Sequence, residues 1–283
     1  MLVKKIILIL IMSIVHPGAR CQDLSKQYAL KYSIKPGSSF TVDNRSIITD
    51  RKIVADEEKL FIYTTTNMIL GVNILENDVA NGNVVEMEYL EKSFINYWDD
   101  GRVENRDHQK IIHSKIQFTL SEYGEISDFK GFEKFRESED EANQIAEMLH
   151  EELIHLFPHL PNHPVKIGDK WTGGVESDGE NEGFSLEYNL LGEEVIDGIE
   201  CLKITANYVT QSEFPYESRG RTLNVSTHSR GHDIYYFAYK RGFLLSRISI
   251  GNGGLEIMDP PDSLLQRRTN EVLYETNIEF GEL

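Results

Sequence analysis

The chain has 283 residues, of which 40% are hydrophobic and 10% aromatic, enough to bury a substantial core in one large β-rich domain or two smaller ones. This composition excludes a collagen-like chain, a disulfide-stapled miniprotein and a wholly disordered protein. The formal net charge of −17 argues against a reader of nucleic acid and against a polybasic membrane binder, because a negative surface repels phosphate groups.

The first residues predict export. Lys4 and Lys5 precede an apolar run over 6–15, which is far shorter than the roughly 20 residues that a bilayer-spanning helix needs. We therefore interpret residues 1–21 as a signal peptide and residues 22–283 as the mature, β-rich region. No later segment is long and apolar enough to span a membrane, so the mature protein is expected in the periplasm or outside the cell.

The residues around the expected cleavage point leave an alternative open. Ala19 and Cys21 put small side chains at the −3 and −1 positions if the cut falls before Gln22. In the alternative, Cys21 is the lipidated cysteine of a bacterial lipoprotein, although Arg20 precedes it where Gly, Ala or Ser is usual. Lipid anchoring through Cys21 is the less favoured interpretation.

Apolar and polar residues alternate with a period of two through most of the mature sequence, which is typical of half-buried strands. The segments 85–89 and 116–120 show this alternation. In 244–250, one face carries Leu244, Ser246, Ile248 and Ile250, and the opposite face carries Leu245 and Arg247. Turn-forming pairs stand between such runs, and they are Asn81 with Gly82, Asp197 with Gly198, and Arg241 with Gly242. Most gaps are too short to hold a helix, so an antiparallel meander is expected.

One helix is predicted among these strands, at about 138–157. Ser138 with Glu141 three residues later forms a capping box, and Pro158 ends the segment. The helix must bury its apolar stripe on a sheet, and the stripe consists of Ala142, Ile145, Leu149, Leu153 and Leu156. The expected fold class is therefore α+β, mainly β, with a curved antiparallel sheet covered by this one main helix.

A short internal repeat suggests two related β modules, 22–135 and 160–283, joined by the helix. Both contain the pattern Lys, x, Gly, x, x, aromatic, which is followed in each by alternating strands. The matching positions are Lys35, Gly37 and Phe40 in the first and Lys166, Gly168 and Trp171 in the second. Coincidence explains three matched positions as well, so the duplication is only a hypothesis.

The block Pro164-Val165-Lys166-Ile167-Gly168-Asp169-Lys170-Trp171 resembles an uncharacterised family of exported bacterial proteins, in which Pro-Val-Lys-x-Gly-Asp-x-Trp follows a Phe-Pro pair. The resemblance covers roughly residues 30 to 250. It implies an envelope location and an α+β cup, similar in outline to the periplasmic lipoprotein carriers, whose cupped sheet holds acyl chains. It carries over no catalytic residue.

The same block also has a direct physical interpretation. Gly168 and Asp169 are typical of a turn, and Trp171 enters the next strand, where its ring can close the end of a core. We therefore predict a structural role for these three residues.

Histidines cluster at His150, His155, His159 and His163. Neutral imidazole is a common metal ligand, so the last three are candidate metal ligands. However, His150 and His155 are five residues apart where a helical zinc site needs four, and prolines interrupt the later part. We therefore interpret this region as a polar helix end and loop, and no cofactor is predicted.

We hypothesise an exported, non-catalytic envelope protein whose cupped sheet binds a hydrophobic or lipid-like ligand or an envelope protein. Neither a Gly-x-Ser-x-Gly elbow, a phosphate-binding Walker loop nor a Cys-x-x-Cys pair occurs in the sequence. Two alternatives remain: a metal-dependent hydrolase that uses the region from His150 to His163, and a structural or adhesive envelope protein. Nucleic acid is not an expected partner.

Overall fold

A computed structural model describes residues 23–54, 57–78, 82–107, 112–131, 153, 155–175, 184–218, 221–259 and 263–280. The described chain is almost entirely β, with 75% of it in strands. No helix within these ranges has the length and apolarity needed to cross a membrane. The predicted signal peptide, residues 1–21, lies outside the described residues.

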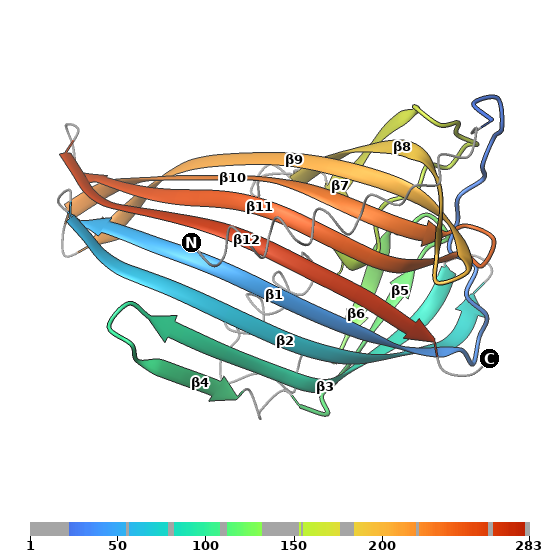
Figure 1. The fold of residues 1–283 in the computed structure, drawn as a ribbon, viewed down its shortest axis with the longest axis horizontal. Helices are drawn as coiled ribbons and strands as arrows, with labels where there is room; N and C mark the ends of the chain where they lie inside the picture. Colours follow the sequence, from blue (N-terminus) through green and yellow to red (C-terminus); the bar gives the residue numbers. More distant parts are fainter. Residues whose placement is uncertain are drawn as a thin grey trace.

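In the part of the chain that the structure describes, twelve strands form one sheet (Figure 1). The first six are β1 (Ser39–Val54), β2 (Glu57–Asp78), β3 (Gly82–Trp98), β4 (Val103–Asp107), β5 (Lys115–Leu120) and β6 (Ile126–Lys130). The last six are β7 (Lys170–Val175), β8 (Phe184–Ile196), β9 (Ile199–Ser218), β10 (Arg221–Ala238), β11 (Phe243–Asp259) and β12 (Ser263–Phe280).

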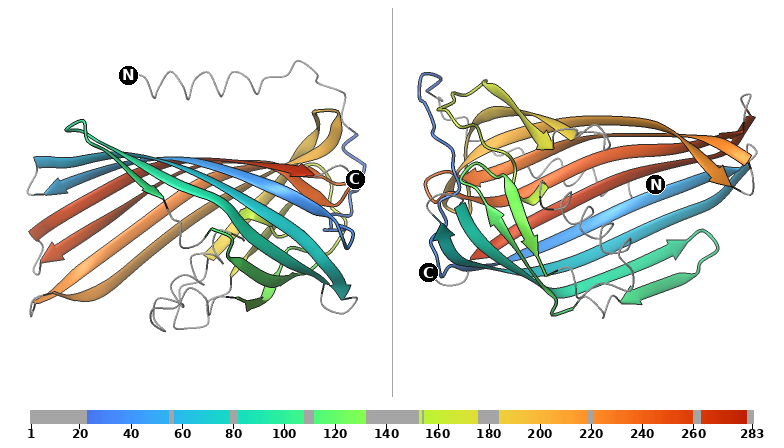
Figure 2. Two further views of the ribbon diagram at one scale, coloured as in Figure 1. Left: turned by 90° about the horizontal axis from the view of Figure 1, so that it is seen from below. Right: turned by 180° about the vertical axis from the view of Figure 1, so that it is seen from behind.

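The strands follow an antiparallel meander. The order across the sheet is β6-β5-β3-β2-β1-β12-β11-β10-β9-β8-β7, with β4 paired to β3 beside this path. The first and last strands of the chain meet at the centre, where fourteen residues of β1 pair with β12 from Phe40 opposite Phe280 to Ile53 opposite Arg267. The two arms, β1 to β6 and β7 to β12, therefore join into one continuous curved sheet, which Figure 2 shows from below and from behind.

The predicted turns are confirmed. Gly82, Gly198 and Gly242 all have positive φ values. Gly82 begins β3, Gly198 lies between β8 and β9, and Gly242 lies between β10 and β11, while Asn81 is outside the described residues. Positive φ is cheap for glycine because it has no Cβ. The duplication of two modules stays a prediction, although the two arms correspond to its two ranges.

Two irregular segments, residues 28–34 and 155–165, close one end of the sheet. The backbone of residues 28–34 hydrogen-bonds to the backbone of Val165, Glu122 and Gly242, with N···O distances of 2.8–3.0 Å. Glu122 precedes β6, Val165 precedes β7 and Gly242 precedes β11, so this one segment bridges both arms. In Figure 1 it is the dark blue trace at the end of the sheet where β5, β6 and β7 gather.

Aromatic side chains fill this closed end, which we call the base and define as residues 28–34 and 155–165 with the strand ends that they contact. The Tyr32 ring lies 5.5 Å from Phe237 and 5.9 Å from Phe157, and Phe157 lies 5.8 Å from Phe118. Since β5 supplies Phe118 and β10 supplies Phe237, the base buries the two arms against each other. Burying large rings of this kind contributes strongly to stability.

The predicted α+β class with a covering helix at 138–157 is wrong. Within the described residues the structure is one open antiparallel sheet, and no main helix covers it. Most of the predicted helix, 138–152 and residue 154, lies outside the described residues. The physical reason for the error is that the apolar face at the base is buried by the irregular segments and by the opposite arm of the sheet. Leu153 and Leu156 contribute to that core.

Candidate ligand-binding face

Alternation along the strands gives the sheet two faces. The inner face is the one that carries the buried side chains of the core, for example Val42, Leu70, Met87, Tyr188 and Tyr235. The opposite face is called the outer face. The inner face continues beyond the base along the long strands β1, β2 and β9 to β12, and there its side chains become more polar and less buried.

The residues of the predicted structural block lie in and beside the base. The Trp171 ring stacks on Tyr188, with centroids 5.5 Å apart and an angle of 11° between the rings, and its Nε1 donates to the His159 carbonyl at 2.8 Å. Gly168 has a φ of 95°, and Asp169 Oδ2 accepts from the Lys166 backbone N–H at 2.8 Å, which closes the turn. These contacts tie the 155–165 segment to β7 and β8.

A buried polar cluster marks the boundary between the base and the rest of the inner face. Asp233 is fully buried, and its carboxylate accepts from Arg247 Nη2 at 3.1 Å and from the Tyr235 hydroxyl at 2.8 Å. His155 Nδ1 lies 3.2 Å from the same carboxylate. The cluster therefore connects the 155–165 segment to β10 and β11 through one carboxylate.

The electrostatics of this cluster favour charged Asp233 and neutral His155. Burial alone would raise the pKa of Asp233, but the Arg247 guanidinium and the hydrogen bonds outweigh it and hold that pKa well below its ordinary value. Burial and the Arg247 charge lower the pKa of His155, against the opposing pull of Asp233. The arrangement is an ion pair with a neutral imidazole beside it, and Asp233 is too strongly stabilised as an anion to serve as a base near neutral pH.

Glycines on β10 and β11 make room for an aromatic ring on the inner face. A Cβ on Gly231 would lie 2.3 Å from the Tyr208 ring, and a Cβ on Gly251 would lie 3.0 Å from its hydroxyl oxygen. Tyr208 therefore lies across two strands that carry no side chain there. Glycine inside a strand is unfavourable by propensity, and close approach of another group is one recognised reason for it.

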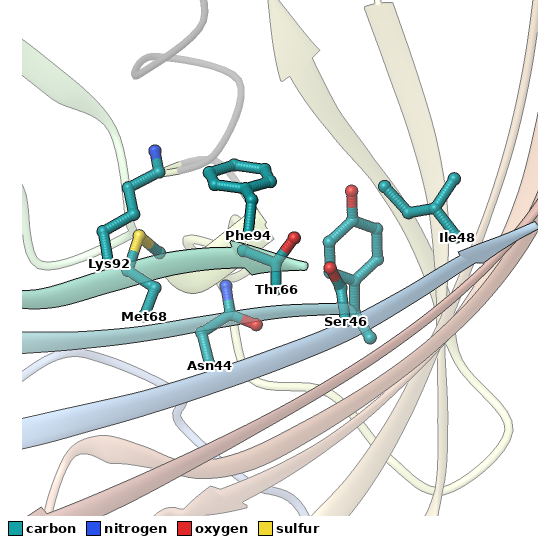
Figure 3. Close-up of a pocket in the computed structure, with 8 residues that line it drawn as sticks. Asn44, Ser46, Ile48, Thr66, Met68, Lys92 and Phe94 are labelled. Carbon is teal, nitrogen blue, oxygen red and sulfur yellow. The ribbon is translucent and has the colours of Figure 1, made fainter. Parts of the chain in front are cut away.

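A small pocket of about 80 Å³ opens on the inner face (Figure 3). Four neighbouring strands supply its lining, since Asn44, Ser46 and Ile48 come from β1, Thr66 and Met68 from β2, Lys92 and Phe94 from β3, and Tyr274 from β12. The register explains the grouping, because Met68 pairs with both Asn44 and Lys92.

Two polar groups in this pocket lack the partners that buried groups usually have. Thr66 Oγ1 is buried and makes no hydrogen bond. Lys92 is only 7% exposed, and its Nζ lies 5.6 Å from the centroids of the Tyr89 and Phe94 rings. Figure 3 shows Lys92, Thr66 and Phe94 projecting from the same side of the sheet. This pocket is the strongest candidate for recognition of a polar group.

A second, larger pocket of about 280 Å³ lies on the outer face. Its ionisable lining residues are Arg51, His228, Arg230 and Glu271. Arg230 Nε donates to Asn252 at 3.0 Å, and Arg51, His228 and Arg230 are all exposed to solvent. Exposed charges of mixed sign are well solvated, so this pocket gives no clear indication of a ligand.

The histidines predicted as candidate metal ligands have separate environments. His155 contacts Asp233, His159 Nδ1 accepts from the Gly174 backbone N–H at 3.3 Å, and His163 is exposed beside Asn162. In the described part of the chain, no group of three His, Cys, Asp or Glu side chains could hold a metal ion. His150 lies outside the described residues.

Sequence reasoning missed Lys92, Thr66 and the pair formed by Asp233 and Arg247. A lysine at a strand position where alternation predicts an apolar residue could have indicated a buried charge such as Lys92. However, period-two alternation from Tyr89 would place Glu91, not Lys92, on the inner face. The Leu90 bulge between them reverses the alternation.

Comparison with known proteins supports only the fold. The sequence matches no model of a protein family and no curated protein, so the resemblance of residues 164–171 to a family of exported proteins stays a prediction. Among solved structures, one named for the lipid–protein interactions of lipovitellin has a similar fold, with a TM-score of 0.52 and 9% sequence identity. The alignment covers 87% of this chain and 25% of that chain, so this chain spans about a quarter of lipovitellin.

Proposed function

We propose that this protein binds a lipid-like ligand, without catalysis, on the part of the inner face that extends beyond the base. The observation that carries the proposal is the change in burial along that face. Tyr188 and Phe237 in the base are fully buried, whereas Ile48, Phe94 and Val272 beyond it are only half-buried. Apolar side chains that line an open, curved sheet offer a surface on which an acyl chain can be buried.

The likeness to lipovitellin supports this proposal at the level of fold, because that structure is named for its lipid–protein interactions. Affinity requires no reactive side chain. Burial of each methylene contributes roughly 0.8 kcal/mol, so ten buried methylenes contribute about 8 kcal/mol before the cost of ordering the chain is subtracted.

The proposal is tested with two neighbouring isoleucines of β1. Ile48 lies on the inner face and lines the pocket, whereas Ile47 lies on the outer face, and both are half-buried. The purified chain is titrated with Nile red, a neutral lipophilic dye, and co-purifying lipid is measured by native mass spectrometry. Ile48→Glu should abolish dye uptake and bound lipid, and Ile47→Glu should leave both close to wild type. No uptake by the wild type, or equal loss in both variants, would refute the proposal.

We also propose that the protein acts outside the cytoplasm, from the pattern of residues 1–21. The intact mass of protein collected from the envelope or medium of expressing cells tests this. A chain that begins at Gln22 supports cleavage, a lipid-modified chain that begins at Cys21 supports anchoring, and a chain that retains Met1 contradicts export.

A further inference from the structure

One buried charge on the inner face stands apart from the others. In the described part of the chain four charged side chains are buried, namely Asp50, Lys92, Asp233 and Arg247. Asp50 accepts two hydrogen bonds from Arg268 Nε at 2.8 Å, and Asp233 accepts from Arg247. Within the same described ranges, Lys92 has no carboxylate partner. A buried ammonium without a counter-charge is costly, so this position needs an explanation.

The carboxylates nearest to Lys92 in sequence have other partners. Glu91 accepts from Asn67 Nδ2 at 3.0 Å, and Glu88 contacts His113 Nδ1 at 3.0 Å. Both lie on the outer face, opposite Lys92. The Tyr89 and Phe94 rings at 5.6 Å give the ammonium partial stabilisation, and a second donor, the Thr66 hydroxyl, is buried without a partner in the same pocket. A cation and an unused hydroxyl side by side suit an anionic oxygen ligand.

We infer that this pocket holds the carboxylate of a long-chain fatty acid, with Lys92 as its counter-charge and Thr66 as a hydrogen-bond donor. The inference rests on the proposed function and specifies its ligand class. The pocket volume of about 80 Å³ leaves room for a carboxylate and bound water, since a cavity needs only about 10–15 Å³ to admit one water. The acyl chain extends from the pocket past Phe94 and Ile48, which line it and are half-buried.

The net charge of −17 makes this pocket specific rather than generally attractive to anions. The charged surface repels free anions at long range. A fatty acid overcomes this repulsion because burial of its chain supplies most of the affinity, and the ammonium then selects the acid over an uncharged analogue.

The test compares cis-parinaric acid, a fluorescent fatty acid, with its methyl ester at pH 8. We expect the wild type to bind the acid at least ten-fold more tightly than the ester. Lys92→Met, which keeps the length of the side chain without its charge, should remove this preference and leave ester binding within two-fold. The ligand-free Lys92→Met protein should also melt at a higher temperature than the wild type, because an unpaired buried charge has been removed.

Lys115→Met is the matched control, since Lys115 is a half-exposed lysine whose Nζ lies 2.8 Å from Glu86. The Lys115→Met variant should keep the wild-type preference for the acid over the methyl ester. If Lys92→Met does not fold, Thr66→Val takes its place and should reduce the preference several-fold. Equal binding of acid and ester by the wild type, or a preference that survives these changes, would overturn the inference. If Nile red still binds when the inference fails, the proposed function stands. If Nile red, cis-parinaric acid and its methyl ester all fail to bind, both the inference and the proposed function are overturned.

Discussion

Replacing Asp233 by Asn should destabilise the protein strongly, because it breaks a buried ion pair. The substitution keeps the volume of the side chain, so no cavity forms, but it leaves the Arg247 guanidinium, only 6% exposed, without the carboxylate that lies 3.1 Å away. Breaking a buried pair in this way costs about 3–5 kcal/mol. Domains of this kind are stable by about 5–15 kcal/mol, so the loss would be a large fraction of the total.

The assay is urea unfolding followed by tryptophan fluorescence, in which Trp171 reports because it stacks on Tyr188 in the base. Asp43→Asn is the control, since Asp43 is half-buried and pairs at 2.6 Å with Arg45, whose side chain is largely exposed, and such a salt bridge contributes little. The difference in the free energy of unfolding between the wild type and Asp233→Asn should also depend on pH. A carboxyl whose pKa is lowered by folding stabilises the protein above its ordinary pKa of 3.8, and this stabilisation is lost as the pH falls below that value. Losses below about 1 kcal/mol in both variants, or a difference that does not shrink in acid, would refute the reasoning.

Two further predictions concern the base and the single described cysteine. Gly242→Ala should lower the melting temperature more than Gly37→Ala, because both glycines have positive φ but only at Gly242 would a Cβ lie 2.6 Å from a backbone atom, the Ser33 nitrogen. Equal losses would contradict the bridging role of residues 28–34. Burial raises the pKa of Cys201 to about 11, so the native thiol should react far more slowly with Ellman's reagent at pH 8 than the urea-unfolded thiol. The Cys201→Ser variant gives the background, and equal native and unfolded rates would show that the thiol is accessible.

Local sequence patterns were sufficient to predict the strands and the turns. The alternation at 85–89 and 116–120 falls within β3 and β5, and the turn pairs lie where hairpins form. These features depend on backbone preferences of a few adjacent residues, which the sequence records directly. The meander follows from them because the connections are too short for parallel crossovers.

The covering helix could not be judged from local signals alone. A capping box and an apolar stripe describe what a segment prefers by itself, whereas the burial of a sheet depends on which partners reach it. Here residues 28–34 and the opposite arm occupy the apolar face of the base, and those contacts join positions more than a hundred residues apart, such as Tyr32 and Pro158.

The polar cluster was missed because alternation separates two faces without saying which one is buried. In 244–250, apolar residues share the face of Ile250, yet Ile250 is 47% exposed and Arg247 is buried. Arg247 is stable in the interior because Asp233 lies close to it on the adjacent strand. The sequence does not show that pairing, since it depends on the register between β10 and β11.

A single inserted residue determines the sign of the charge in the inner pocket. Leu70 pairs with Tyr89 and Ile69 pairs with Glu91, so Leu90 is an extra residue that bulges from β3. With uninterrupted alternation, Glu91 would follow Tyr89 onto the inner face and add a further negative charge to a strongly negative protein. The bulge instead brings Lys92 inward and leaves Glu91 outside, hydrogen-bonded to Asn67. A charge that selects a ligand can therefore depend on backbone register as much as on residue type, and this explains why composition and alternation located the face but not the pocket.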